Sequence, residues 1–180
     1  MPDVPWRWTP TIPRVSAISN SRLTPRDLAA PDVLVATGLG AGFLPLAPGT
    51  WGTLLGALLW WIAFAGASPL VQVAATATLV AGAGWLLHFL CARRRLHDDP
   101  ALVLDEVAGV WVALLFVPPE LPLMVAACVL FRLFDIWKPW PVSWADREVG
   151  GGLGVLLDDV LAGLLALAVI HAGRWAVAAV

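Results

Sequence analysis

The chain has 180 residues, of which 59% are hydrophobic and only 13% are charged, and its mean hydropathy is +0.81. This balance lies outside that of ordinary soluble domains and predicts a protein that is partly solvated by lipid. The formal net charge of −2 and the pI near 5.8 provide no basic field, which argues against a nucleic-acid partner.

The N-terminal segment has the composition of a flexible cytoplasmic tail. Its arginines stand among Pro, Ser and Thr, and it lacks the apolar core of a signal peptide. We therefore expect residues 1–32 to form a tail and residues 33–180 to form a single helical membrane domain.

The rest of the chain consists of apolar segments separated by Gly, Pro or basic residues that interrupt helices. No formally charged residue lies between Asp32 and Arg93, a stretch long enough for at least two crossings of ~20 residues each. In chain order, we expect helices over residues 51–67, 70–91, 101–117, 121–137 and 153–171. The fold class predicted is an all-α, multi-pass helical membrane bundle.

The basic residues predict how this bundle is oriented. Ten of the eleven fall in the N-terminal tail or in connections on one side of the expected helices, and only Arg174 falls on the other side. The positive-inside rule makes the side with ten cytoplasmic. Of the thirteen acids, only Glu120 falls in an expected external turn. A site built from acids is therefore expected at the cytoplasmic face.

Three of the expected helices carry acids near their cytoplasmic ends: Asp105, Glu106, Asp135, Asp158 and Asp159. Ionisable groups at such depth are costly and need partners or a function. Arg132, Lys138 and Arg147 offset only part of this charge, and a set of oxygen ligands favours a hard cation such as Mg²⁺. The alternative is a structural one, in which the acids form buried ion pairs with these bases.

Each of the two acidic pairs has a small residue at the same spacing after it. Gly109 lies four positions after Asp105, and Ala162 lies four positions after Asp158. Positions i and i+4 share a helix face, and small residues allow helices to approach closely in a membrane. The pattern predicts that the two acid-bearing helices pack face to face.

A second candidate site precedes the helix expected at residues 51–67. Gly49, Thr50 and Thr53 stand where a helix begins, and free N–H groups at a helix start attract phosphate. An ordinary turn followed by a helix cap explains this segment as well. His97 precedes the helix that carries Asp105, and we include it as a candidate phosphate contact or acid.

Taken together, the motifs resemble those of the phosphatidylglycerophosphatase A family. The strings that carry the resemblance are GLGAGFLPLAPGTWGT at residues 38–53, His97-Asp98, Asp105-Glu106 with Gly109, FRLFDIWKPWP at residues 131–141, Asp146-Arg147, and GGLG through Asp158-Asp159 to Gly163. They run in the family's order over residues 33–170, and only the N-terminal tail lies outside them.

The resemblance implies an Mg²⁺-dependent lipid phosphatase of the cytoplasmic (inner) membrane that converts phosphatidylglycerophosphate to phosphatidylglycerol and phosphate. The expected metal ligands are Asp105, Glu106, Asp135, Asp158 and Asp159, which would also provide the catalytic base. Arg132 and Lys138 would offset charge on the phosphate, with Gly49, Thr50, Thr53 and His97 as further phosphate contacts. The alternative function is a small ion or solute carrier, because intramembrane carboxylates also mark ion pathways.

Overall fold

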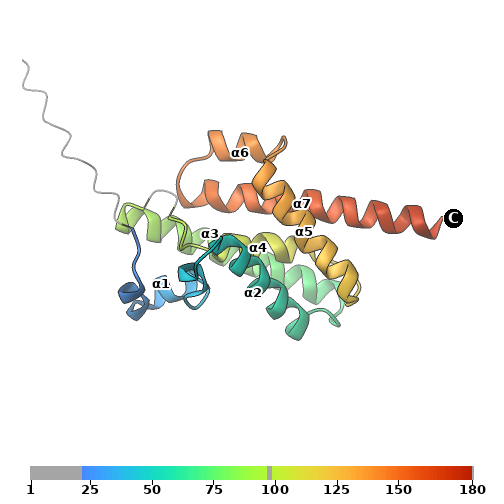
Figure 1. Ribbon diagram of the computed structural model, residues 1–180, viewed down its shortest axis with the longest axis horizontal. Coiled ribbons are helices and arrows are strands. Elements are labelled where there is room, and N and C mark those ends of the chain that lie inside the picture. The colour runs from blue at the N-terminus through green and yellow to red at the C-terminus, as the bar shows by residue number, and fades with distance from the viewer. Residues whose placement is uncertain (1–21, 97–98, 180) are drawn as a thin grey trace, which may run out of the picture.

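The computed structural model describes residues 22–96 and 99–179, and His97 lies outside them. Within these ranges every regular element is helical, which confirms the predicted fold class. The elements are η1 (Pro25–Ala29), α1 (Pro31–Ala36), η2 (Ala41–Phe43), α2 (Pro48–Ala63), α3 (Pro69–Arg94), α4 (Leu104–Ala113), α5 (Leu121–Trp137), α6 (Val142–Glu148) and α7 (Gly151–Ala178). Figure 1 shows α7 running along much of the molecule, with its C-terminal end extending beyond the other helices.

Two helices, α3 and α7, are long and apolar enough to cross a membrane. Helix α3 has 26 residues, starts at Pro69 after Ser68, and carries Arg93 and Arg94 in its last turn. Helix α7 has 28 residues and continues to Ala178, beyond the end expected from sequence. Their length and composition indicate that the protein is associated with a membrane.

Helix α4 corrects one of the sequence predictions. A helix was expected over residues 101–117, but α4 has only ten residues. At 1.5 Å per residue it is ~15 Å long, about half of a bilayer's hydrocarbon core. Every residue of α4 except Glu106 is buried, and α2, α3, α5 and α7 all pack against it. Helix α4 is therefore a short internal helix that the other helices enclose.

Helices α4 and α7 pack face to face, as the pattern of small residues predicted. A Cβ atom on Gly163 would lie 2.3 Å from the carbonyl oxygen of Gly109, and one on Gly109 would lie 2.8 Å from that of Asp159. Only glycine permits the two backbones to approach this closely. The contact fixes the position of Asp159 along the helix axis relative to the first turn of α4.

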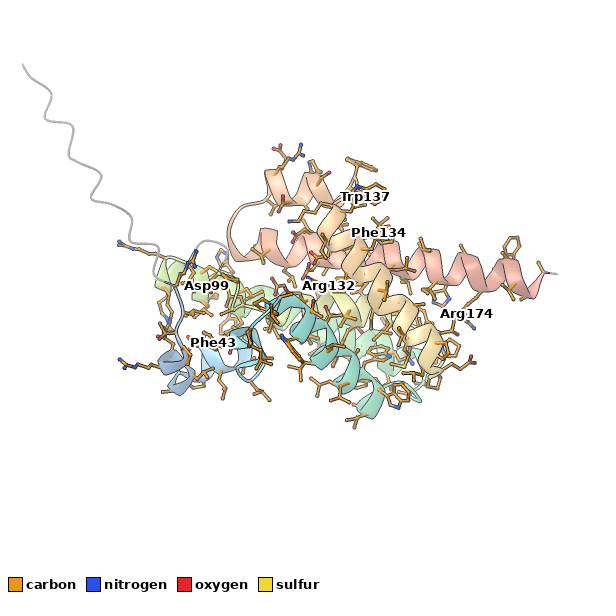
Figure 2. The ribbon with its side chains drawn as sticks, viewed as in Figure 1. Phe43, Asp99, Arg132, Phe134, Trp137 and Arg174 are labelled. Carbon is orange, nitrogen blue, oxygen red and sulfur yellow. The ribbon has the colours of Figure 1, made fainter. Side chains whose placement is uncertain are left out.

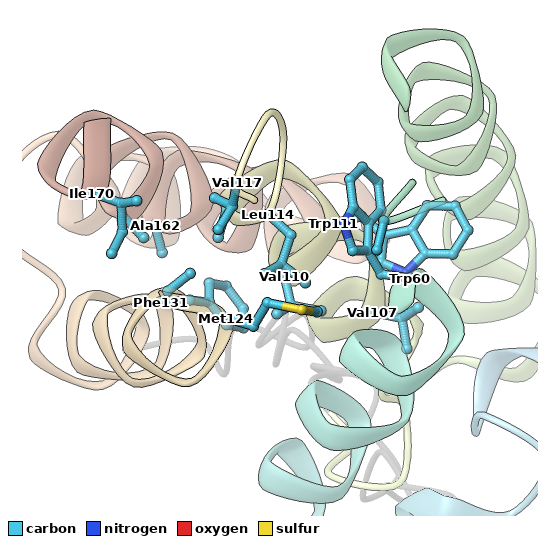
Figure 3. Packing of buried hydrophobic residues seen from close by; sticks show 14 of the residues in the cluster. Trp60, Val107, Val110, Trp111, Leu114, Val117, Met124, Phe131, Ala162 and Ile170 are labelled. Atoms are coloured by element: carbon cyan, nitrogen blue, oxygen red, sulfur yellow. The ribbon is translucent and has the colours of Figure 1, made fainter. Parts of the chain in front are cut away.

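The apolar core surrounds α4. Trp60, Phe64 and Trp111 form an aromatic cluster, in which the rings of Trp60 and Trp111 lie 5.7 Å apart. The Trp111 indole Nε1 donates a hydrogen bond to the carbonyl oxygen of Gly56 at 2.9 Å, which satisfies its buried polar group. Figure 3 shows Trp60 and Trp111 near Val107 of α4, with Phe131 on the opposite side of the core. The core thus holds α2, α4 and α5 together around the site.

Residues 22–32, which the sequence analysis assigned to the tail, contact the body of the protein. Asp27 forms an ion pair with Arg94 at 2.7 Å, and Asp32 pairs with Arg93. The amide of Leu23 donates to Oδ2 of Asp99 at 2.7 Å. This segment therefore ties the end of α3 to the connection that leads into α4.

Candidate active site

Three of the predicted acids come together at the crossing of α4 and α7. Asp105 and Glu106 lie in the first turn of α4, and Asp159 lies in α7. One oxygen from each carboxylate lies within 4.8 Å of the others, close enough for one cation to contact all three. Asp105 and Asp159 are each only 4% exposed. The first turn of α4 also favours negative charge, because the helix dipole is positive there.

This group has the chemistry of a site for a hard cation. Oδ1 of Asp105 and Oε2 of Glu106 are buried and have no hydrogen-bond partner among the described residues. Buried polar atoms are rarely left unpaired, so these two oxygens require a partner of another kind. The ligand set offers oxygen alone, which suits Mg²⁺ or Ca²⁺ better than zinc or copper. The residues present therefore fit the predicted metal.

Arg132 lies beside the three carboxylates. Its Nη1 is 2.7 Å from Oδ2 of Asp135 and 4.0 Å from Oε1 of Glu106. Its Nε has no hydrogen-bond partner among the described residues. Figure 2 shows Arg132 near the centre of the molecule, where α5 passes α2. One arginine shared by two acids leaves Asp105 and Asp159 without a basic partner in the described ion pairs, so ion pairing alone does not account for the cluster.

A cavity of about 220 Å³ opens on this group and reaches the start of α2. Gly49 lines it together with Asp105, Glu106 and Arg132. A Cβ atom on Gly49 would lie 2.4 Å from Oε1 of Glu106 and 2.8 Å from Nη1 of Arg132, so any larger residue would force these side chains to move. The positive end of the α2 dipole thus lies against the cavity, which favours an anion such as phosphate.

The predicted threonines lie farther along α2. Thr53 is buried, and its hydroxyl donates to the carbonyl oxygen of Gly49 at 2.8 Å. Thr50 is exposed at the start of the helix. Both line an apolar groove between α2 and α5 rather than the carboxylate cavity. The candidate His97 lies outside the described residues.

Asp158 and Lys138 form a neighbouring polar site. Nζ of Lys138 lies 2.9 Å from Oδ2 of Asp158 and also pairs with Asp146. Burial alone would lower the pKa of the Lys138 ammonium, but the hydrogen bonds to both carboxylates outweigh it and raise that pKa above its ordinary value. Lys138 is therefore a permanent cation. It lines a separate cavity of about 200 Å³ that also includes Gly151.

Two acids around the site were absent from our sequence-based candidates. Asp146 belongs to α6, a helix that the sequence analysis did not predict, and it is the second acid bound to Lys138. Asp99 lines the carboxylate cavity, and its two oxygens accept from the amides of Leu23 and Ala101. The sequence signals were the Asp146-Arg147 string and the position of Asp99 ahead of the helix that carries Asp105.

Comparison with known proteins agrees with this geometry. The family profile of phosphatidylglycerophosphatase A matches residues 34–174. The Escherichia coli K12 phosphatidylglycerophosphatase A is 32% identical over 161 residues, covering 89% of this chain and 91% of the relative. The Haemophilus influenzae phosphatidylglycerophosphatase A is 35% identical over 154 residues, covering 85% and 94%.

A third relative, from Bacteroides thetaiotaomicron, is 40% identical over 157 residues, covering 81% of this chain and 94% of the relative; its provisional name is phosphatidylinositol-3-phosphatase. No solved structure matches the chain. The profile covers well over half of the chain, and two relatives with the same name exceed 30% identity over most of it. The chain therefore belongs to the phosphatidylglycerophosphatase A family and is an enzyme that hydrolyses phosphate esters.

Proposed function

We propose that this protein is an Mg²⁺-dependent phosphatase that converts phosphatidylglycerophosphate to phosphatidylglycerol and phosphate in phospholipid biosynthesis. The observation that carries the proposal is the buried group of Asp105, Glu106 and Asp159 beside Arg132, in which two oxygens have no hydrogen-bond partner in the part of the chain that the structure describes. Family membership supports the phosphatase activity.

The three carboxylates of Asp105, Glu106 and Asp159 would hold the metal ion. When bound, Mg²⁺ polarises phosphoryl oxygens and lowers the pKa of water. Hydrolysis transfers the terminal phosphoryl group to water: a new P–O bond forms, and the P–O bond to the glycerol oxygen breaks. The products are inorganic phosphate and the lipid alcohol.

The cations around the cavity would hold the phosphate. Arg132 lines the cavity, and its Nε has no hydrogen-bond partner within residues 22–96 and 99–179. Asp135 fixes its guanidinium through the 2.7 Å ion pair. A guanidinium suits phosphate because its donors form a planar fork. The start of α2 at Gly49 adds the positive end of a helix dipole. Together these groups stabilise negative charge on the phosphoryl oxygens during transfer.

Lys138 and Asp158 would act without contacting the metal. Asp146 and Asp158 hold the Lys138 ammonium at the edge of the separate cavity. From there Lys138 would partly offset the negative charge of the acids of α7.

We infer further that the protein crosses the cytoplasmic (inner) membrane several times and that the site faces the cytoplasm. The ten-to-one division of basic residues supports this orientation. The carboxylates converge at a single crossing of α4 and α7 instead of being spaced along a path through the bundle, which favours an enzyme over an ion carrier.

Phosphate release from the purified full-length protein tests the proposal. Phosphatidylglycerophosphate should be hydrolysed with Mg²⁺, not after EDTA treatment, and again once Mg²⁺ is restored. Phosphatidylinositol 3-phosphate and phosphatidic acid serve as competing substrates. Full turnover in metal-free buffer would refute the Mg²⁺ dependence. Hydrolysis of only the inositol lipid would refute phosphatidylglycerophosphate as the substrate.

Metal binding is also measured without turnover. Mg²⁺ should raise the Tm of the wild-type protein in detergent, because a ligand that binds only the folded state stabilises it. The Asp159→Asn variant should lose this increase.

A further inference from the structure

An apolar groove of about 460 Å³ runs between α2 and α5. Its walls are mostly large apolar side chains, among them Leu54, Leu58 and Trp61 of α2 and Met124, Val125 and Val129 of α5. Several of these are about half exposed, including Leu58 at 56% and Val129 at 59%. The groove is therefore open to whatever surrounds the protein.

The groove ends at the active site. Arg132 lines both the groove and the carboxylate cavity, and Thr50 in the groove adjoins Gly49 in the cavity. Among the described lining residues, the hydroxyl and guanidinium groups are those of Thr50, Thr53 and Arg132, near this end. From Arg132 to Leu121, at the other end of α5, is 11 residues, or ~16 Å along the helix axis. The polar end at Arg132 followed by an apolar groove matches a molecule that has a phosphate at one end and an apolar chain attached to it.

We propose that the groove between α2 and α5 holds one acyl chain of the lipid substrate while the terminal phosphate lies against Arg132 and the carboxylates. This assignment rests on the proposed function and specifies a second contact for its substrate. The side chains of the groove would then determine the class of substrate. A long acyl chain in the groove positions the phosphate at Arg132, whereas a soluble phosphate ester has no such chain.

The role of the groove is positional. An acyl chain gains little by leaving the bilayer for an equally apolar protein surface, since lipid tails are as apolar as leucine. Holding the chain instead limits the orientations of the phosphate at Arg132, and such restriction is one way in which remote contacts accelerate a reaction. The effect of the groove is therefore expected in kcat/KM for long-chain substrates.

Two substitutions fill the groove without entering the core: Val125→Trp and Val129→Trp, at positions 51% and 59% exposed. Val71→Trp is the matched control, because Val71 is 46% exposed on α3 and lines neither the groove nor the cavity. Each variant is assayed on dipalmitoyl and on water-soluble dibutanoyl phosphatidylglycerophosphate. The ratio of kcat/KM for the long chain to that for the short chain should fall about tenfold in both groove variants and stay unchanged in the control.

An unchanged ratio in folded groove variants would overturn the assignment, and so would an equal loss on both substrates, which would mean that the variants disturb the phosphate site. A wild-type protein that hydrolyses neither ester would instead refute the proposed function.

A second measurement tests the groove without turnover. A non-hydrolysable phosphonate analogue that carries a photoreactive acyl chain should crosslink to residues 54–61 and 121–129, and Val125→Trp should abolish these crosslinks. Crosslinks on α3 at the same yield would overturn the assignment. If the wild-type protein is inactive but still crosslinks in the groove, the acyl-chain assignment stands and the proposed function is refuted.

Discussion

Asp158 and Asp159 are consecutive residues of α7, but their carboxylates have different neighbours. Oδ2 of Asp158 lies 2.9 Å from Nζ of Lys138, whereas Asp159 lies within 4.8 Å of Asp105 and Glu106. Consecutive positions on an α-helix differ by ~100° in direction, since a turn takes 3.6 residues. One acid therefore has a basic partner, and the other lies among acids.

This difference predicts opposite behaviour for the two asparagine variants. Asp159→Asn should reduce kcat more than about a hundredfold, a barrier increase of ~2.7 kcal/mol, because it removes a proposed metal ligand. In EDTA its Tm should equal or exceed that of the wild type, since like charges repel each other in the metal-free cluster. Asp158→Asn should lower the Tm, because Lys138 loses a partner, and should retain more activity.

Turnover per folded molecule and thermal unfolding in detergent measure both effects, with the exposed Glu120→Gln as a control. If Asp159→Asn keeps more than about a tenth of wild-type turnover, a barrier change below ~1.4 kcal/mol, Asp159 does not hold the metal.

Gly49→Ala should impair catalysis while the protein remains folded. The added Cβ atom would lie 2.4 Å from Oε1 of Glu106, so Glu106 or Arg132 must move. A misplacement of ~1 Å at a reacting centre can reduce the rate about a hundredfold. Gly82→Ala is the matched control, because no atom of the described residues lies within 4 Å of its added Cβ. Steady-state kinetics of both variants decide the matter: equal kcat would show that the approach of Gly49 to Glu106 is not needed.

Gly163→Ala should lower the Tm. Its Cβ atom would lie 2.3 Å from the carbonyl oxygen of Gly109, and forcing an extra carbon into a packed contact typically costs ~1–3 kcal/mol. The added Cβ of Gly173→Ala, in the same helix, meets no atom within 4 Å in the described parts of the chain. This variant should be neutral or slightly stabilising, since alanine is the better helix former. Thermal unfolding in detergent compares the two variants. A Gly163→Ala protein as stable as Gly173→Ala would show that α4 and α7 are not in such close contact.

The orientation predicted from the basic residues is tested by cysteine labelling in a background without Cys91 and Cys128. Glu120→Cys should react with a membrane-impermeant maleimide added outside intact cells, whereas Glu148→Cys should react only after the membrane is opened. Both positions are exposed on the protein surface. The reverse pattern would place the carboxylate cavity on the external side.

Much of the helical architecture was predictable from the sequence because particular residue types, such as proline and runs of basic residues, mark the ends of the helices. Helix α5 covers Leu121–Trp137 as expected, since Pro139 prevents its continuation, and α3 ends at the basic residues that were expected to end it. Asp105, Glu106 and Asp159 were among the five acids that the sequence singled out, because buried charge needs a partner or a function.

Tertiary structure decided the features that depend on packing. Apolar residues precede α4 and continue through it. Hydrophobicity does not distinguish the buried helix from the non-helical residues before it, such as Val103, whose amide donates to the carbonyl oxygen of Ala36. The assignment of Lys138 to Asp158, and of Asp159 to the group with Asp105 and Glu106, depends on how α7 is rotated against α4 and α5. That rotation is set by the contact of Gly109 with α7, which brings together residues about fifty positions apart.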